Sequence, residues 1–330
     1  MKSVLKSLKW IGIVLVLLVI GLFSFIQFTW DKKYDVPYPD ITATTDSVVI
    51  ARGRHLALGP AHCISCHVPM EKVREAEDGK VMPLSGGWEL SIPPGTFRAP
   101  NITPDMETGI GKMTDGEIAR TLRYSVNKND GHVFPFMPFQ QLSDEDLTAV
   151  VSFLRSQEPV KHHVEPSEYS FLGKALMAFG MIKPVGPKST PSKSIEIEPT
   201  IAYGSYIANA VANCNGCHTK RDFKTGAFVG EPFAGGTHFM PDAFTEGYSF
   251  VTPNLTPHNE TGIIAAWDEV AFIQRMRGGK IHNGTPMPWA TFARMTDLEL
   301  KAIYRYLNSL EPVENKIGKI VYAPGEELSE

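Results

Sequence analysis

The pattern Cys-x-x-Cys-His occurs twice in this chain, and it constrains the fold more than any other feature. The two copies run from Cys63 to His67 and from Cys214 to His218. In this pattern two thiols add to the vinyl groups of a haem as thioethers, and the histidine that follows binds the iron. The spacing lets two cysteines on one short helical turn reach both vinyl groups. The sequence therefore predicts two covalently bound haems c, held by Cys63, Cys66 and His67 and by Cys214, Cys217 and His218.

Paired cysteines also form zinc sites, so zinc is the main alternative for these residues. The cysteine pairs of a four-cysteine zinc site are usually about 15–20 residues apart, whereas Cys66 and Cys214 are separated by most of a domain. Zinc also gives no reason for a histidine after both pairs. Because the two motifs use all 4 cysteines, none is left for a disulfide or a nucleophilic thiol.

An uncharged apolar run lies near the N-terminus, from Trp10 to Trp30, with lysines on both sides. It is long enough to cross a bilayer as a helix. A cleaved signal peptide would have an apolar region of about 7–15 residues that ends in small residues. This run ends in aromatic residues, which suit the membrane interface. We therefore expect residues 1–33 to be a retained single-pass anchor in the inner (cytoplasmic) membrane. Thiols of this pattern are joined to haem outside the cytoplasm, so the haem domains are expected in the periplasm.

The remainder of the chain reads as a tandem duplication. Matching segments occur in the same order around each haem motif, at 51–55 and 202–206, 86–87 and 235–236, 100–104 and 253–257, 107–110 and 260–263, and 158–160 and 311–313. A chain of 330 residues is long enough for two domains with separate cores. We expect one domain at 34–160 and a second, with a C-terminal tail, at 200–330. Residues 161–199, rich in proline, lysine and serine, are expected to be an extended linker.

Short helices between long loops are predicted, which makes the expected fold all-α. A middle helix is expected near 115–126 and near 268–277, and each copy ends in a helix with one apolar face, around Leu147 and around Leu300. Thr114 with Glu117 and Thr296 with Glu299 have the spacing of capping boxes. The closing helices are expected to pack on the first helix of their own domain.

Three further segments have alternative interpretations. The apolar segment 171–182 is too short to span a membrane, and we expect it to pack across the domain interface; contact with a membrane or a partner is the alternative. Asn101 and Asn254 match the glycosylation sequon, but we interpret them as structural loop residues near the haems. The remaining histidines, including His55, are expected on the surface or in loops.

The sixth ligand of each iron is predicted to be a methionine. Met137 and Met287 occupy equivalent places, each followed by proline and shortly before the closing helix. Proline biases the residue before it toward extended backbone, so the side chain can project from a loop. The alternative is that these methionines only fill the core. His132, near Met137, and His282, in the second copy, are alternative ligands.

These motifs resemble the multihaem cytochrome c subunits of membrane-bound dehydrogenases, such as bacterial alcohol and gluconate dehydrogenases. The resemblance covers 47–160 and 200–313 and rests on the haem motif, the glycine pair, the Pro-Asn-Ile-Thr-Pro segment and the Met-Pro pair. It implies two class I cytochrome c domains. One haem would be held by Cys63, Cys66, His67 and Met137, and the other by Cys214, Cys217, His218 and Met287. Such subunits usually carry three haem domains, and this chain has two.

The function implied is that of a membrane-anchored electron carrier and not an enzyme. Its donor would be a dehydrogenase or a quinol-linked protein, and its acceptor a terminal oxidase or a soluble cytochrome. A dihaem subunit of a haem–copper oxidase and a dihaem cytochrome c peroxidase are the alternatives. A net charge of −4 gives no basic footprint for nucleic acid.

Overall fold

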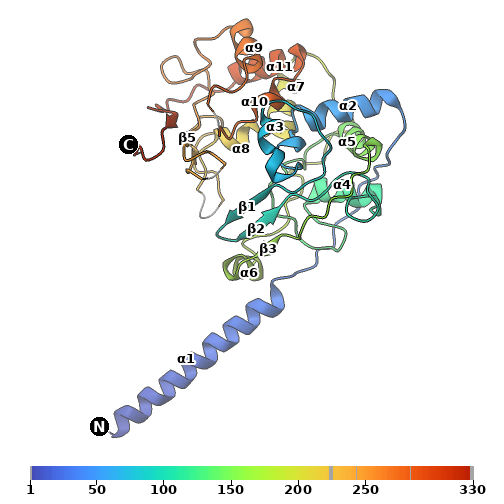
Figure 1. Ribbon diagram of the computed structural model, residues 1–330. Helices are drawn as coiled ribbons and strands as arrows, with labels where there is room; N and C mark the ends of the chain where they lie inside the picture. The colour runs from blue at the N-terminus through green and yellow to red at the C-terminus, as the bar shows by residue number, and fades with distance from the viewer. Residues whose placement is uncertain (1, 223–225, 243, 283, 328–330) are drawn as a thin grey trace.

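The computed structural model describes residues 2–222, 226–242, 244–282 and 284–327. Helix α1 (Lys2–Thr29) projects away from the rest of the chain, which forms two halves of similar construction (Figure 1). The first half contains α2 (Ser47–Leu58), η1 (Cys63–Ser65), η2 (Met70–Lys72), α3 (Val73–Glu77), β1 (Glu89–Ile92), β2 (Gly95–Arg98), α4 (Asp115–Tyr124), α5 (Asp144–Ser156), β3 (Glu168–Tyr169) and α6 (Phe171–Ala178). The second half contains α7 (Ile201–Tyr206), the π-helical turn η3 (Ile207–Val211), α8 (Cys214–His218), β4 (His238–Phe239), β5 (Ser249–Val251), α9 (Glu269–Arg277), α10 (Trp289–Phe292), α11 (Asp297–Asn308) and β6 (Val321–Tyr322).

Each half is built on two crossed helices, α2 with α5 and α7 with α11. A glycine permits the close approach in both cases. A Cβ atom at Gly53 would overlap the carbonyl oxygen of Ala149, and one at Gly204 would overlap that of Ala302. The prediction that each closing helix packs on the first helix of its own half is therefore confirmed.

The predicted helix signals also agree with the structure. Capping boxes begin α4 at Thr114 and α11 at Thr296, in each case with the glutamate three residues later. The apolar faces of the closing helices are buried, with Leu147 and Leu300 both 0% exposed. Helices α4 and α9 lie where the middle helices were expected.

Two small antiparallel sheets correct the all-α expectation. Their strand orders are β1-β2-β3 and β4-β5-β6. The third strand comes from beyond the expected domain in the first half, where Tyr169 pairs with Gly95, and from the C-terminal tail in the second, where Tyr322 pairs with Ser249. Residues 161–199 are therefore not simply an extended linker, because they add a strand to the first sheet.

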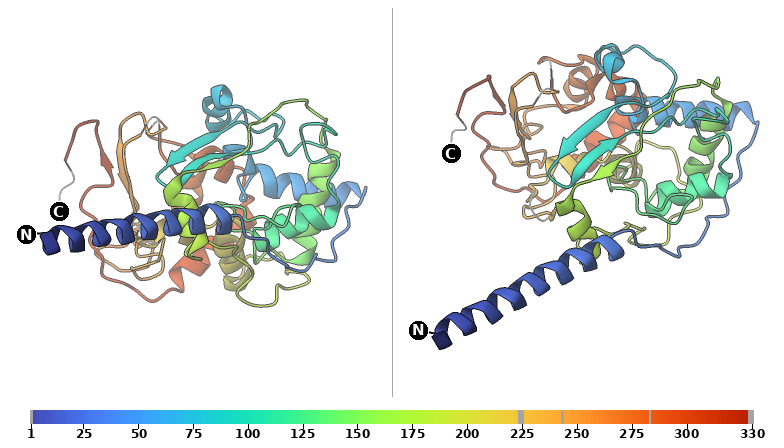
Figure 2. Two further views of the ribbon diagram at one scale, coloured as in Figure 1. Left: turned by 90° about the horizontal axis from the view of Figure 1, so that it is seen from below. Right: turned by 60° about the horizontal axis from the view of Figure 1, so that its bottom comes forward.

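The apolar segment 171–182 lies beside α1, as both views of Figure 2 show. Phe171 of α6 stacks on Phe23 of α1, and Phe179 packs against Phe25, with ring centroids 5.7 and 5.6 Å apart. Ile26 of α1 is only 2% exposed. The expectation that this segment packs across the interface between the halves is wrong.

Helix α1 is long and apolar enough, by length and composition, to cross a membrane. Its span from Ser3 to Thr29 contains a stretch with a mean hydropathy of 2.7, and almost all of that stretch is exposed.

Buried side chains of the two halves form one continuous core. It includes Leu56 and Leu147 of the first half and Tyr203, Leu300 and Ile303 of the second. The halves are thus packed against each other and are not separate bodies on a loose tether.

Candidate haem-binding sites

The two cysteine motifs begin in the same way. In each, the residue before the first cysteine adopts a left-handed backbone, at His62 (φ 40°) and Asn213 (φ 53°), and a short helical turn then carries the two thiols. Burial raises the pKa of Cys63 and Cys214 to about 12 and that of Cys66 to about 11, so these thiols are protonated at neutral pH. The two cysteine pairs are not brought together, since no group of three or more Cys, His, Asp or Glu among the described residues is placed to hold a metal ion. This arrangement disfavours a four-cysteine zinc site.

A backbone carbonyl orients the histidine of each motif. The Nδ1–H of His67 donates a hydrogen bond to the carbonyl of Pro100 (2.8 Å), and that of His218 donates to Pro253 (3.1 Å). A carbonyl can only accept, so Nδ1 carries the proton and Nε2 keeps its lone pair for a metal. Burial lowers the pKa of both histidines, which favours the neutral imidazole that iron requires.

In each half, a repeated glycine packs against the proline whose carbonyl orients the histidine. Gly86, which has a positive φ, donates its N–H to the carbonyl of His67 (3.0 Å), and a Cβ atom on Gly86 would overlap the backbone of Pro100. Gly235 makes the equivalent contacts with His218 and Pro253. A larger residue at either glycine would displace the carbonyl that orients the histidine.

The repeated asparagines fix the loop that carries this proline. Asn101 donates to the carbonyl of Val160 (2.8 Å) and accepts from the backbone of Thr103 (3.0 Å). Asn254 makes the equivalent contacts in the second half, with the carbonyl of Val313 (2.8 Å) and the backbone N–H of Thr256 (2.9 Å). Both asparagines are at most 2% exposed, which confirms that they are structural loop residues and not glycan acceptors.

The two predicted methionines lie in loops just before the closing helices. Met137 and Met287 are both half-buried and pack against the core. The side chain of Gln140 donates to the backbone carbonyl of Met137 (2.8 Å), which fixes that loop. Met287 lines a cleft together with Trp289 and with Ser65 of the first cysteine motif. The second methionine loop therefore lies beside the first haem motif.

The two alternative histidines differ from each other. His132 is buried, its Nδ1 lies 3.2 Å from the hydroxyl of Tyr169, and its ring stands edge-on to Phe134. Burial lowers its pKa to about 4. Its Nε2 has no hydrogen-bond partner among the residues that the structure describes. His282, by contrast, is exposed, which makes it the weaker candidate for an iron ligand.

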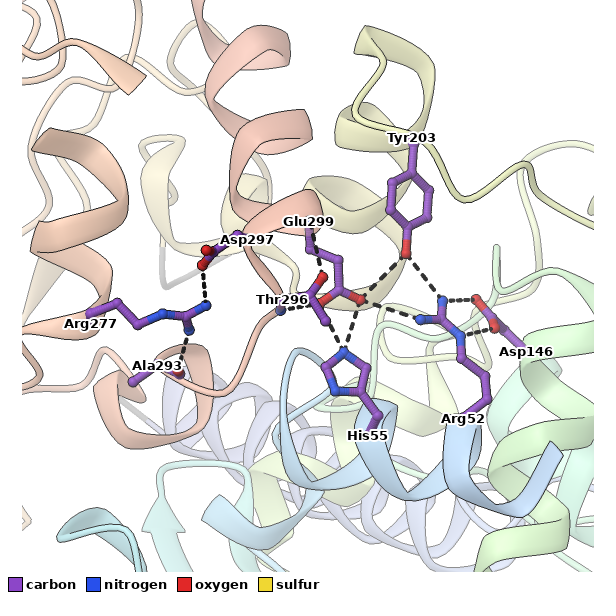
Figure 3. A network of polar contacts seen from close by, with 9 residues as sticks. All are labelled: Arg52, His55, Asp146, Tyr203, Arg277, Ala293, Thr296, Asp297 and Glu299. Carbon is purple, nitrogen blue, oxygen red and sulfur yellow. Dashed lines mark hydrogen bonds and ion pairs between the residues drawn. The ribbon is translucent and has the colours of Figure 1, made fainter. Parts of the chain in front are cut away.

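A buried polar network joins the two halves (Figure 3). The guanidinium of Arg52 binds both carboxylate oxygens of Asp146 (2.8 and 3.0 Å) and one oxygen of Glu299 (3.3 Å). His55 lies 2.8 Å from Glu299, and the hydroxyl of Tyr206 donates to Asp146 (2.8 Å). In each half, an acid in the first turn of the closing helix contacts the first helix of the other half. The network is therefore arranged with approximate two-fold symmetry.

Glu299 stays ionised in this network. Burial raises its pKa, but the hydrogen bond and charge of His55 and the charge of Arg52 outweigh burial and hold the pKa below the ordinary 4.5. The sequence indicated Glu299 only as a capping residue and gave His55 no role. The signal available was the alignment of the repeat, which sets Arg52 and His55 opposite Tyr203 and Tyr206.

Comparison with known proteins agrees with these sites. Residues 50–158 match the sequence model of the family Cytochrome c. The chain is 29% identical over 286 residues to the cytochrome c subunit of alcohol dehydrogenase (quinone) from Gluconobacter oxydans, which covers 81% of this chain and 56% of that protein. It is 26% identical over 314 residues to the gluconate 2-dehydrogenase cytochrome c subunit of Pantoea cypripedii, covering 89% and 64%. A diheme cytochrome c-type protein of Cereibacter sphaeroides is 28% identical over 266 residues, covering 76% and 83%.

The chain thus spans less than two thirds of the length of the dehydrogenase subunits that it matches, and most of the length of the diheme protein. Cysteine, histidine and loop residues at the first site all fall inside the matched segment. Residues 50–158 therefore match a cytochrome c domain, which implies a covalently bound haem c, and the chain as a whole is similar to the cytochrome c subunits of alcohol and gluconate dehydrogenases and to the cytochrome subunit of fructose dehydrogenase.

Proposed function

We propose that this chain is a membrane-anchored dihaem cytochrome that relays electrons from a dehydrogenase or quinone-linked donor toward a terminal oxidase. One observation carries the proposal. Behind each Cys-x-x-Cys-His motif, the same histidine–proline–glycine–asparagine contacts recur, at Pro100 and at Pro253. Two sites built alike in one chain suit two haems that exchange electrons.

The second haem domain is supported by this repetition. The family match covers the first copy, 50–158, but the second half has the same crossed helices, the same three-stranded sheet and the same oriented histidine. We therefore assign two class I cytochrome c domains, 34–160 and 200–330. Strand β3, within 161–199, belongs with the first of them.

We assign His67 and Met137 as the axial ligands of one iron and His218 and Met287 as those of the other. A c-type haem takes up and releases one electron, and a thioether ligand favours its ferrous state. Nδ1 of each histidine is occupied by a carbonyl, so Nε2 is the atom presented to the iron. With both axial positions filled, neither iron has a place for peroxide or another small substrate, which favours a relay over a peroxidase.

The donor is inferred from the relatives, whose names describe cytochrome c subunits of alcohol, fructose and gluconate dehydrogenases. Helix α1 would hold the chain in the inner membrane, near quinone-linked donors and oxidases. Because haem is attached outside the cytoplasm, residues 31–330 would lie in the periplasm.

A deletion strain tests this role. It should lose respiration on one particular substrate, while the upstream dehydrogenase in its membranes still reduces an artificial dye. The full chain should restore respiration, and a His218→Gly variant produced at the same level should not. Loss of dye reduction together with respiration would contradict a relay downstream of the dehydrogenase. Rapid peroxide turnover by the purified chain, with a reduced cytochrome as donor, would favour a peroxidase instead.

A further inference from the structure

An apolar face lies on α6 and the turn that follows it. It consists of the exposed side chains Phe171, Leu172, Phe179 and Met181, which are 51%, 49%, 58% and 68% exposed. The opposite side of α6 is occupied, since Gly173 and Met177 are buried. Four large, exposed apolar side chains on one short segment form an apolar patch, and such patches are typical of sites that contact a partner or a membrane.

The position of this face along α1 indicates what covers it. Phe171 stacks on Phe23, which lies six residues before Thr29, the last residue of α1. At the helical rise of 1.5 Å per residue, Phe23 is roughly 9 Å from that end. If α1 crosses a bilayer, the ring of Phe171 must therefore lie at the same depth as Phe23, below the end of the membrane helix. Peripheral amphipathic helices sit at this depth, with their apolar face about 5–10 Å into the boundary between headgroups and acyl chains.

The polar groups beside the face match the chemistry of a membrane interface. The ammonium of Lys174 lies 5.0 Å from the ring of Trp30, and the ammonium of Lys32 donates to the carbonyl of Ala178 (2.9 Å). Tryptophan is typical of the headgroup level of a membrane, and so is lysine, whose ammonium group can reach the polar interface. These contacts also tie α6 to the end of α1, so the two helices have a fixed relative position.

We propose that the α6 face inserts into the outer leaflet of the phospholipid bilayer beside α1, as a second attachment of the chain to the membrane. A single helix leaves the attached domains free to swing, whereas a second contact fixes which surface of the haem domains faces the lipid. This proposal rests on the membrane anchor of the proposed function. The occupant is lipid and not a protein partner, because the face continues the lipid-facing surface of α1 directly.

Methionine oxidation in nanodiscs tests the proposal with the full chain. The purified holoprotein, one copy per phosphatidylcholine–phosphatidylglycerol disc, is treated briefly with chloramine-T, and the sulfoxide at each methionine is measured by mass spectrometry. Met181 (68% exposed), Met240 (64%) and Met106 (58%) would oxidise at similar rates in water. Insertion should slow Met181 roughly fivefold or more relative to Met240, because the acyl boundary excludes the oxidant. Equal rates at Met181 and Met240 would overturn the proposal.

A variant identifies the source of the protection. Leu172→Glu puts a charge on the α6 face and should raise the oxidation rate of Met181 at least twofold. Ile281→Glu, on a more exposed side chain of the second half (72% against 49%), should not change that rate. Unchanged protection in Leu172→Glu would contradict insertion of this face. Carbonate extraction separates the two proposals. If carbonate releases the chain from membranes, the anchor itself is wrong; if the chain stays and Met181 oxidises freely, only the α6 insertion is wrong.

Discussion

At the scale of single residues, each histidine proposed as an iron ligand is oriented by a neutral group. His67 and His218 donate to proline carbonyls and not to carboxylates. A carboxylate would make the imidazole more basic and stabilise ferric iron. A carbonyl fixes the same ring orientation with less donation to the metal. With the proposed methionines as the second ligands, this arrangement would favour haems that are readily reduced.

Replacing a proposed methionine ligand should change one haem only. Met137→Ala or Met287→Ala should leave one iron five-coordinate, able to bind carbon monoxide when ferrous, and with a lower potential, because the thioether no longer favours the ferrous state. Optical spectra and a redox titration of each variant would measure both effects. Met240→Ala, at an exposed methionine, is the control and should match the wild type.

For the first haem, His132 is the alternative to Met137 as the iron ligand. Nε2 of His132 is buried without a partner among the described residues, so it is available to a metal. If Met137→Ala leaves both ferric spectra unchanged while His132→Ala alters one, the first haem has two histidine ligands.

Glu299 should stabilise the joined halves mainly through its charge. Glu299→Gln leaves Arg52 and His55 facing a neutral amide inside a buried network and should lower the free energy of unfolding by about 3 kcal/mol at pH 7. Glu117→Gln is the matched control. Glu117 has the same capping-box position in α4 but makes no ion pair among the described residues, so its loss should cost under about 0.5 kcal/mol.

The stabilisation by Glu299 should depend on pH and decrease in acid. The folded pKa of Glu299 is lowered, so its contribution is fully present above the ordinary pKa of 4.5 and is lost as pH falls toward the folded value. Guanidinium unfolding of the wild type and Glu299→Gln should therefore differ most at pH 7 and converge below pH 4.5. A difference that does not change between pH 7 and pH 3 would mean that shape, not charge, is responsible.

At the scale of elements, the crossed helices depend on two glycines. Gly53→Ala or Gly204→Ala would force a methyl group against a backbone carbonyl of the closing helix and should lower the free energy of unfolding by about 2–3 kcal/mol. In Gly116→Ala, the new Cβ meets only an ordinary contact, 3.5 Å from the ring of Tyr38. Alanine is the better helix former by about 1 kcal/mol, so this control in α4 should be neutral or stabilising. Equal destabilisation of all three variants would show that the close approach of the crossed helices does not cause the loss of stability.

Elements with a local signal could be predicted from the sequence. The capping boxes at Thr114 and Thr296 and the apolar face around Leu147 each need only a few neighbouring residues, and the structure contains all of them. Strands β3 and β6 are two residues long, so alternation of apolar and polar residues has no length in which to appear. They form because a sheet edge is available, which only the folded chain provides.

In the candidate sites too, only the residues with a local sequence pattern could be predicted. The cysteines and the histidine of each haem motif are adjacent in the sequence, so a short pattern identifies them. The proline carbonyl that orients each histidine is a backbone group, so no side-chain pattern identifies it as a partner. Contacts such as His55 with Glu299 join residues far apart in the chain, and their side chains alone suit a surface as well as an interface.

At the scale of the whole molecule, two tandem copies behave as one unit. The shared core and the network of Arg52, Asp146 and Glu299 fix one half against the other, and Met287 lies beside the first cysteine motif. The proposed relay would need its two haems at a constant separation, and this packing would hold the two sites in place without a rigid linker.

The proposed relay requires two haems in one chain, each with both axial positions filled. A spectroelectrochemical titration of the purified full chain, with protein measured by amino-acid analysis, measures both properties. We predict two electrons per chain, low-spin spectra in both oxidation states and no change when carbon monoxide is added to the ferrous protein. One electron per chain, or a ferrous spectrum that shifts with carbon monoxide, would contradict the proposed relay.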